Sequence, residues 1–149
     1  MRSNSMAISQ LIAAPATKVW DAIADWESQG DWMLQTKVIR TSEISAGVGV
    51  KIEAFTGPLY RLYPRFKFLG LLDLMEVTAW DPPRRCDVIH YGKILKGSGT
   101  FEVIALDENH TTFHWSEEIK APWLLFIAAK PFIWLGVKIS LARFARLLE

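Results

Sequence analysis

Glu117 is the residue of this chain whose position most strongly suggests chemistry. The segment 111–119 alternates in a pattern typical of a half-buried strand. One face of that strand carries Phe113, Trp115, Glu117 and Ile119. Burial on this apolar face would raise the pKa of Glu117, so that it can act as an acid, a base or a hydrogen-bond partner. The structural alternative is that Glu117 pairs with an arginine or a backbone amide near the strand end.

His90 is the second candidate. In the predicted strand 85–91 it shares a face with Cys86 and Val88, and if that face points inward His90 is a polar group in an apolar interior. In an antiparallel meander this strand lies two strands from 111–119, roughly 9–10 Å away. The separation predicts that His90 and Glu117 do not bond directly but anchor one ligand at two points. The alternative is a histidine that is satisfied by its neighbours.

Other kinds of site have no support in the sequence. The histidines His90, His110 and His114 lack the spacing of a metal site, and the single Cys86 excludes a cysteine-rich zinc site and an internal disulfide. No nucleophile elbow or phosphate-binding loop is found. Gly97-Ser98-Gly99 is interpreted as a kink where a curved sheet needs small residues. We therefore expect no metal and no cofactor.

Composition predicts one globular domain over 6–149, with a short polar tail at 1–5. Half of the 149 residues are hydrophobic, 22% are charged and the net charge is +1, with acids and bases interspersed. The sequence has no stripe of basic residues of the kind that binds nucleic acid, so we expect no nucleic-acid partner. Seven tryptophans indicate either a large aromatic core or a cavity walled by aromatic rings, and their number favours a cavity. The lone Cys86 fits a cytoplasmic location.

The order of predicted elements indicates an α+β fold. Strands are predicted at 6–13, 34–44, 48–56, 73–80, 85–91, 96–106 and 111–119. Helical residues are expected at 15–25, a short helix or turn at 26–32, and one long helix after Pro122 with a kink at Pro131. Strands do not alternate with helices, so we expect an antiparallel meander. For the apolar segment 57–72 the sequence leaves three alternatives: a lid, part of a strand or a contact with a partner.

The long C-terminal helix is apolar on most sides. Four charges, Lys130, Lys138, Arg143 and Arg146, argue against a transmembrane span and leave a helix on a membrane surface as the alternative. We expect part of this helix to face the sheet, namely Trp123, Phe126, Ile127, Trp134, Leu141 and Phe144. Leu125, Phe132 and Ile139 would then need cover from the first helices, a second subunit or lipid. A homodimer is one arrangement that would provide it.

Several segments together resemble one known superfamily. They are Ile12-Ala13-Ala14-Pro15 with Val19-Trp20, then Val77 to Arg85, Gly97 to Phe101 and Phe113 to Glu118 before a terminal helix. In order and spacing, from about Ala7 to Leu148, the chain resembles the SRPBCC (START/polyketide cyclase, birch-pollen-allergen-like) superfamily. The resemblance implies a helix-grip fold, in which a curved antiparallel sheet of about six to seven strands and a long C-terminal helix enclose a deep apolar cavity.

Binding of an apolar small molecule, such as a lipid, a polyketide or an isoprenoid, is the function we expect. One alternative is an enzyme of the polyketide cyclase/dehydrase type, in which Glu117 or His90 moves protons. The other is a non-enzymatic module that contacts a protein or a membrane. Tyr60, Tyr63 and Tyr91 are weaker polar candidates. The predicted ligand-binding residues are Met75, Val77, Val88, His90, Phe101, Phe113, Trp115, Glu117, Trp123, Ile127 and Trp134.

Overall fold

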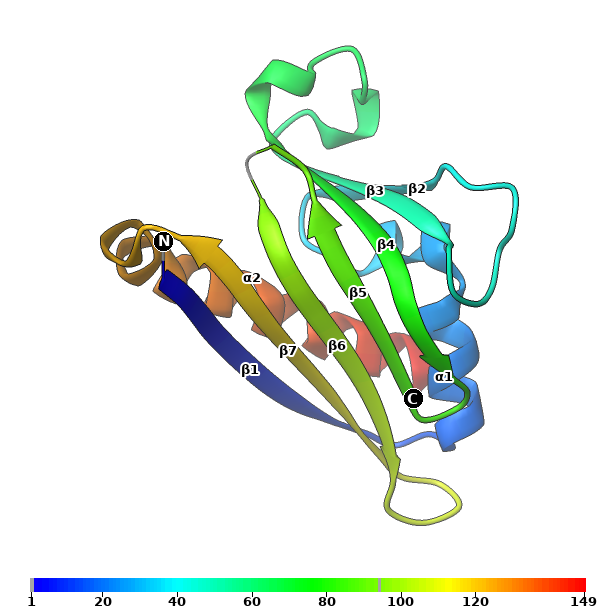
Figure 1. Ribbon diagram of the computed structural model, residues 1–149. Coiled ribbons are helices and arrows are strands. Elements are labelled where there is room, and N and C mark those ends of the chain that lie inside the picture. Colours follow the sequence, from blue (N-terminus) through cyan, green and yellow to red (C-terminus); the bar gives the residue numbers. More distant parts are fainter. Residues whose placement is uncertain (1, 94) are drawn as a thin grey trace.

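A seven-stranded antiparallel sheet and one long helix form the molecule (Figure 1). The computed structural model describes residues 2–93 and 95–149. The strands follow the order β1-β7-β6-β5-β4-β3-β2, so β2 to β7 form a meander and β1 pairs with β7. The predicted α+β helix-grip fold is confirmed. The strands are β1 (Arg2–Ile12), β2 (Thr36–Arg40), β3 (Lys51–Thr56), β4 (Leu71–Asp81), β5 (Arg85–Tyr91), β6 (Lys96–Ala105) and β7 (Thr111–Ala121).

Helices occupy one side and one end of this sheet. In the view of Figure 1, α2 passes behind β5, β6 and β7, while α1 lies at the end where the C-terminus is found. The α-helices are α1 (Ala16–Ala24) and α2 (Trp123–Leu148), and the short 3-10 helices are η1 (Trp26–Asp31), η2 (Tyr60–Leu62) and η3 (Lys67–Leu69). The residues from Arg2 to Ser5, predicted as a tail, instead pair with β7 as part of β1.

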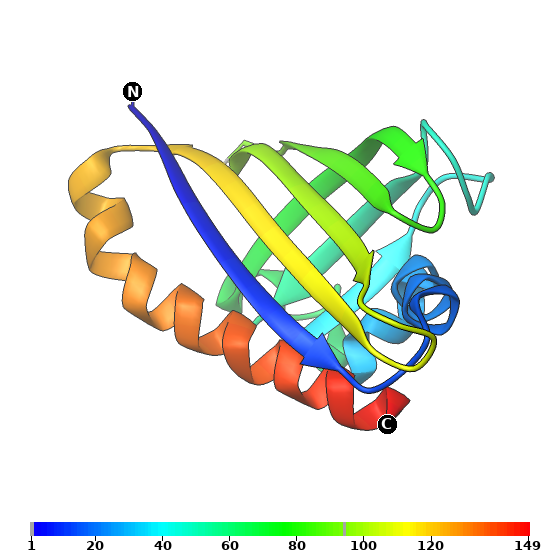
Figure 2. The ribbon, with the colours of Figure 1, turned by 90° about the horizontal axis from the view of Figure 1, so that it is seen from below.

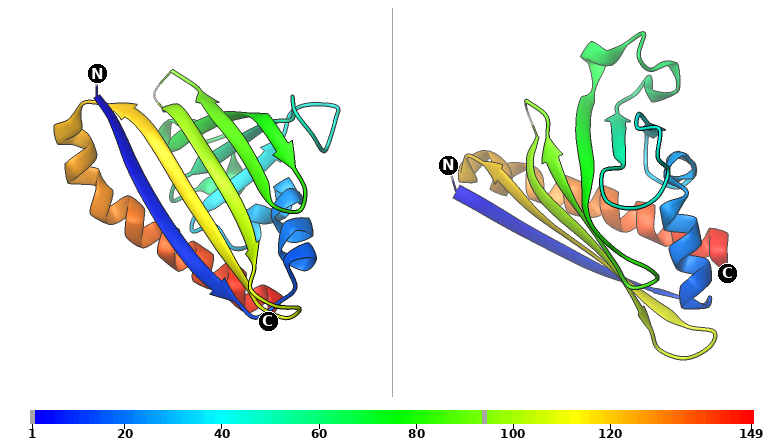
Figure 3. Two further views of the ribbon diagram at one scale, coloured as in Figure 1. Left: turned by 60° about the horizontal axis from the view of Figure 1, so that its bottom comes forward. Right: turned by 45° about the vertical axis from the view of Figure 1, so that its right-hand side comes forward.

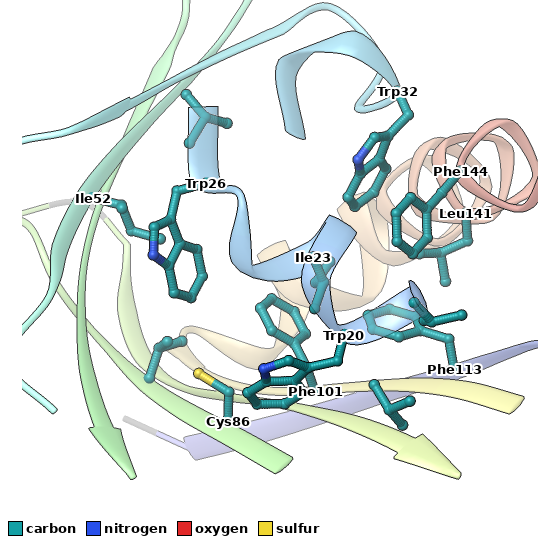
Figure 4. Packing of buried hydrophobic residues seen from close by; sticks show 14 of the residues in the cluster. Trp20, Ile23, Trp26, Trp32, Ile52, Cys86, Phe101, Phe113, Leu141 and Phe144 are labelled. Carbon is teal, nitrogen blue, oxygen red and sulfur yellow. The ribbon is translucent and has the colours of Figure 1, made fainter. Parts of the chain in front are cut away.

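The core lies between α1, η1, the C-terminal half of α2 and the sheet (Figure 4). Val19, Trp20 and Ile23 of α1 are buried, as their helical spacing predicts. Phe144 of α2 packs between Trp32 and Phe113, with ring centroids 4.5 and 5.7 Å away. The buried Trp20, Trp26 and Trp32 thus belong to a packed aromatic core in this half of the molecule.

Strand β4 contains a bulge after Val77. Met75 and Val77 are buried as expected, but the pairing with β5 shifts between Val77 and Ala79. An extra residue in one strand reverses the faces that follow it. Trp80 therefore turns toward the core, where its ring packs edge-on against Trp20 at 5.0 Å.

The segment 57–70 folds into two short 3-10 turns above β3 and β4. Tyr63 lies stacked on Phe55 at 4.7 Å. Phe55 is consequently buried. Other apolar side chains of the segment stay in solvent, and Phe68 is 76% exposed. The segment is thus neither a strand nor a loop without structure.

The two halves of α2 differ in their surroundings. Leu141 and Phe144 are fully buried in the core, whereas Phe126 is the buried residue of the first turns. Figures 2 and 3 show the first turns extending beyond the sheet and curving, and Pro131 lies in this stretch. The prediction that Trp123 and Ile127 face the sheet is therefore wrong, since they are 44% and 54% exposed.

By length and composition alone, α2 could cross a membrane, although its charges argue against a span. Only 17% of its most apolar window is buried inside the protein. The packing of its C-terminal half distinguishes α2 from a free span, since Leu141 and Phe144 belong to the core.

Candidate functional site

Three side chains from three different strands form a hydrogen-bonded network. The ring of His90 (β5) is bonded through Nδ1 to Asp73 Oδ1 (β4) and through Nε2 to Glu117 Oε2 (β7), each at 2.7 Å. Trp115 donates its indole N–H to Glu117 Oε1 at 2.6 Å. The histidine side chain is 3% exposed, while Glu117 and Asp73 are 9% and 17% exposed. The histidine ring is thus shielded from solvent, while the two carboxylates remain slightly exposed.

Two glycines of β6 make the contact between β5 and β7 possible. Gly97 lies opposite His90, and Gly99 lies opposite Glu117. A Cβ atom at Gly99 would come within 2.8 Å of both carboxylate oxygens of Glu117. Because these two residues of β6 have no side chains, the side chains of Glu117 and His90 contact each other directly across the backbone of β6. The prediction that they are too far apart to bond is wrong, because it used the strand spacing and ignored the reach of both side chains across this gap.

The carboxylates keep His90 charged. Burial alone would lower the pKa of His90, but the hydrogen bonds to Asp73 and Glu117 and the charges of both carboxylates raise it to about 10. At neutral pH both ring nitrogens therefore carry protons and donate. Each nitrogen thus donates to one of the two carboxylates.

This arrangement limits the chemistry that His90 can perform. A general base must be unprotonated at the working pH, whereas a histidine with a pKa of about 10 is not. Neither ring nitrogen offers a lone pair to a metal, since both are hydrogen-bonded. Within 2–93 and 95–149, no group of three or more His, Cys, Asp or Glu residues is arranged to hold a metal ion. The network is better suited to accept hydrogen bonds than to transfer protons.

A pocket of about 400 Å³ opens beside Glu117. It lies between strands β1, β6 and β7 and the exposed stretch of α2. Its apolar wall residues are Met6, Ala7 and Trp134, and the polar ones beside Glu117 are Ser5, Ser98, Thr100, Ser116 and Glu118. Lys130 of α2 also lines it. A second pocket of about 450 Å³, lined by His90, Lys96, Glu118 and Lys120, adjoins the same network. The first of these pockets lies at the end where α2 diverges from the sheet (Figure 2).

The predicted ligand-binding residues divide into three groups. Trp115, His90 and Glu117 belong to the network, and Trp134 lines the pocket. Trp123 and Ile127 are exposed on α2. The remaining five are buried strand residues: Met75, Val77, Val88, Phe101 and Phe113.

Sequence reasoning missed Asp73, Met6 and Gly99. Asp73 shares strand parity with Met75, which was the available signal, but its strand follows the ambiguous segment 57–72. The role of Gly99 depends on strand pairing, which the sequence does not give residue by residue.

The three tyrosines do not join the network. Tyr63 donates to Glu53 at 3.0 Å, and burial together with this carboxylate raises the pKa of Tyr63. The Tyr60 hydroxyl accepts a hydrogen bond from Arg61, and Tyr91 is exposed.

Two buried groups lie in the aromatic core, away from the network. Cys86 is a free thiol whose pKa is raised to about 12 by burial and by the charge of Asp87, so it is unreactive at neutral pH. The indole N–H of Trp32 is buried and has no hydrogen-bond partner among the described residues.

Comparison with known proteins agrees with this architecture. A family model described as polyketide cyclase / dehydrase and lipid transport matches residues 4–149. The chain belongs to this family. The predicted SRPBCC-type resemblance is thereby confirmed, and the family supplies a ligand-binding fold. No curated protein matches the chain significantly.

Solved structures resemble the fold at low sequence identity. The Zhui aromatase/cyclase from Streptomyces sp. R1128 gives a TM-score of 0.72 at 15% identity, over 99% of this chain and 94% of that one. A START superfamily protein from Mycobacterium smegmatis gives 0.74 at 10% identity, over 96% and 98%. The di-domain ARO/CYC BexL gives 0.68 at 14% identity, over 98% of this chain and 46% of that one. Identities this low establish the shared fold alone.

Proposed function

We propose that this protein binds an apolar small molecule, of the lipid, polyketide or isoprenoid class, in the pocket between α2 and strands β1, β6 and β7. The observation that carries the proposal is the position of Glu117 in the wall of this pocket, beside Met6 and Trp134. Small-molecule sites combine apolar walls with a few polar groups that fix the orientation of the ligand, and burial of apolar surface against Met6 and Trp134 would supply the affinity.

Glu117 selects the polar group of the ligand. Its carboxylate lines the pocket and accepts hydrogen bonds from His90 and Trp115. A hydroxyl, a phenol or an amine of the ligand can also donate to it, whereas a carboxylate would be repelled. Lys130, also in the pocket wall, supplies one donor for an acceptor elsewhere on the ligand. The preferred guest is therefore an apolar molecule whose inner end carries a hydrogen-bond donor.

An enzymatic role in the same pocket is the second candidate, since a related fold is that of the Zhui aromatase/cyclase. Proton transfer would fall to Glu117, because His90 stays protonated at neutral pH. The substitution Glu117→Gln separates the two roles. Loss of turnover with binding retained would favour the enzyme, whereas loss of affinity would favour an anchor.

Occupancy of the pocket can be tested with a variant that fills it. Met6→Trp adds an indole to the pocket wall, and Leu11→Trp adds one to an exposed position of the same strand. Native mass spectrometry of the protein as purified should show an adduct in the wild type and in Leu11→Trp, and none in Met6→Trp. If no adduct appears, titration with the neutral apolar fluorophore N-phenyl-1-naphthylamine should rank the three proteins in the same order. Equal binding by all three would refute the pocket.

A further inference from the structure

Positive charges gather at one end of the molecule, although they are dispersed along the sequence. The segments 57–72, 93–96 and 119–139 carry three, two and three lysines or arginines, and none of them carries an aspartate or a glutamate. All eight cationic side chains are exposed. We call this set the basic rim: Arg61, Arg65, Lys67, Lys93, Lys96, Lys120, Lys130 and Lys138.

The fold places these segments at the end of the molecule away from α1. Figure 1 shows the 57–70 turns at the top and the start of α2 at the upper left, while α1 and the C-terminus lie at the lower right. The right-hand view of Figure 3 shows the same separation. The α1 end instead carries both signs of charge, since Asp21, Asp25, Glu27 and Asp31 lie there together with Lys18 and Arg143. Among the described residues, Glu118 lines a pocket with Lys96 and Lys120, and Glu117 lines one with Lys130, so these two carboxylates offset part of the charge of the rim.

Large apolar side chains stand exposed among the rim cations. Phe132 of α2 is 79% exposed, and Phe68 of the 57–70 turns is 76% exposed. Others on the same segments share this exposure: Leu62, Leu69, Leu124, Leu125, Ile127 and Leu135. Exposed apolar side chains of this size often mark surfaces that contact a protein or a membrane.

Several rim cations lie over aromatic rings. Lys138 Nζ is 4.6 Å from the ring centroid of Trp134, and the Arg65 guanidinium is 5.5 Å from that of Phe66. None of the ion pairs among residues 2–93 and 95–149 uses a rim cation. The positive charges therefore remain available to an anionic partner.

We propose that the basic rim docks on the surface of an anionic phospholipid bilayer. The cations would contact lipid phosphates and carboxylates, and Phe68, Phe132 and their apolar neighbours would enter the boundary between headgroups and acyl chains. Docking would place the pocket that contains Lys130 and Trp134 against the lipid. Docking itself does not depend on the function proposed above.

Charge and packing favour this partner over two others. A symmetric dimer through the same face would set one group of eight cations against its copy, which like-charge repulsion opposes. A membrane-spanning α2 would have to withdraw Leu141 and Phe144 from the core, where both are fully buried. A surface contact through the first turns of α2 leaves the core intact.

Vesicle co-sedimentation of the full chain tests the proposal. The wild type should sediment with vesicles containing phosphatidylserine, far less with phosphatidylcholine alone, and less as salt is raised. Arg65→Glu and Lys93→Glu should each lower partitioning by roughly 30-fold, because each changes the rim by two charges. Phe68→Asp and Phe132→Asp should also reduce it.

Matched controls lie at the opposite end of the fold. Lys51→Glu reverses an exposed lysine at the start of β3, and Leu106→Asp changes an exposed apolar residue beside the β6–β7 turn. Both should bind vesicles as the wild type does, and circular dichroism should show that every variant is folded. Equal binding to both vesicle types would overturn the proposal, as would loss of binding in the controls. A lipid-free dimer that Phe132→Asp dissociates would assign the surface to a second copy instead.

Discussion

At the scale of single residues, the notable feature is a protonated histidine buried between two carboxylates. Removing charged groups from water is costly, and the network of Asp73, His90 and Glu117 offsets this cost through two 2.7 Å hydrogen bonds and the indole N–H of Trp115. Each member depends on the others, since a carboxylate left unpaired at this depth costs about 3–5 kcal/mol. Such a network fixes the geometry of the pocket wall.

The raised pKa of His90 predicts a pH-dependent stability. The folded protein holds the imidazole proton up to a pH of about 10, whereas the unfolded chain releases it near 6.5. The stabilisation is therefore complete below pH 6.5 and is lost as the pH rises toward about 10. Urea unfolding across this range should show the free energy of unfolding falling by at most about 1.4 kcal/mol per pH unit.

Two histidine variants check that His90 causes this slope. His90→Gln should flatten the profile and lower stability at neutral pH. His110→Asn, in the exposed turn between β6 and β7, should leave the slope unchanged. A flat profile in the wild type would show that His90 is neutral in the folded protein.

Residue patterns predicted part of this site. Strand parity grouped His90 with Cys86 and Val88 but left open whether their face points inward, and in the structure all three are buried. The direct bond between His90 and Glu117 depends on two glycines of a third strand, and on Asp73 of a fourth, so it follows only from strand pairing.

At the scale of elements, β6 and α2 shape the site. Gly97 has a φ of +136°, and a Cβ there would overlap the carbonyl oxygen of Glu118, so the strand can pass close to β7 only with glycine. The first turns of α2 leave the sheet and open the pocket beside this stretch of β6. The sequence predicted the kink in β6. It wrongly predicted that Trp123 and Ile127 face the sheet, because a helix that is apolar on all sides has no periodicity that distinguishes its faces.

A methyl group at position 99 should disturb the network without disturbing the fold. In Gly99→Ala the new Cβ would force the carboxylate of Glu117 to move, because it would lie 2.8 Å from both oxygens. We expect a loss of about 1–3 kcal/mol in stability, and a lower pKa of His90 in an NMR titration.

Gly136→Ala is the matched control. Nothing lies within 4 Å of a Cβ at this helical position, so alanine should stabilise by about 0.5–1 kcal/mol and leave the His90 titration unchanged. An unaltered His90 titration in Gly99→Ala would mean that Gly99 does not determine how Glu117 is held.

At the scale of the whole molecule, one end is packed and the other is open. Trp20, Trp26 and Trp32 fill the space under the sheet near α1, while pocket, network and basic rim lie at the other end. The order of the elements, together with the segments that resemble the SRPBCC superfamily, was sufficient to predict the helix-grip architecture. They could not predict the uneven filling, because apolar residues that pack a core and those that line a pocket have the same composition.

The indole N–H signals of the seven tryptophans give the most direct test that a guest binds beside Glu117. During titration with N-phenyl-1-naphthylamine, the ¹⁵N–¹H signals of Trp134, in the pocket, and Trp115, bonded to Glu117, should shift together and saturate. Those of Trp20 and Trp26, in the packed core, should stay in place. Shifts confined to the core tryptophans, or a saturating titration that leaves Trp115 and Trp134 unmoved, would contradict the account.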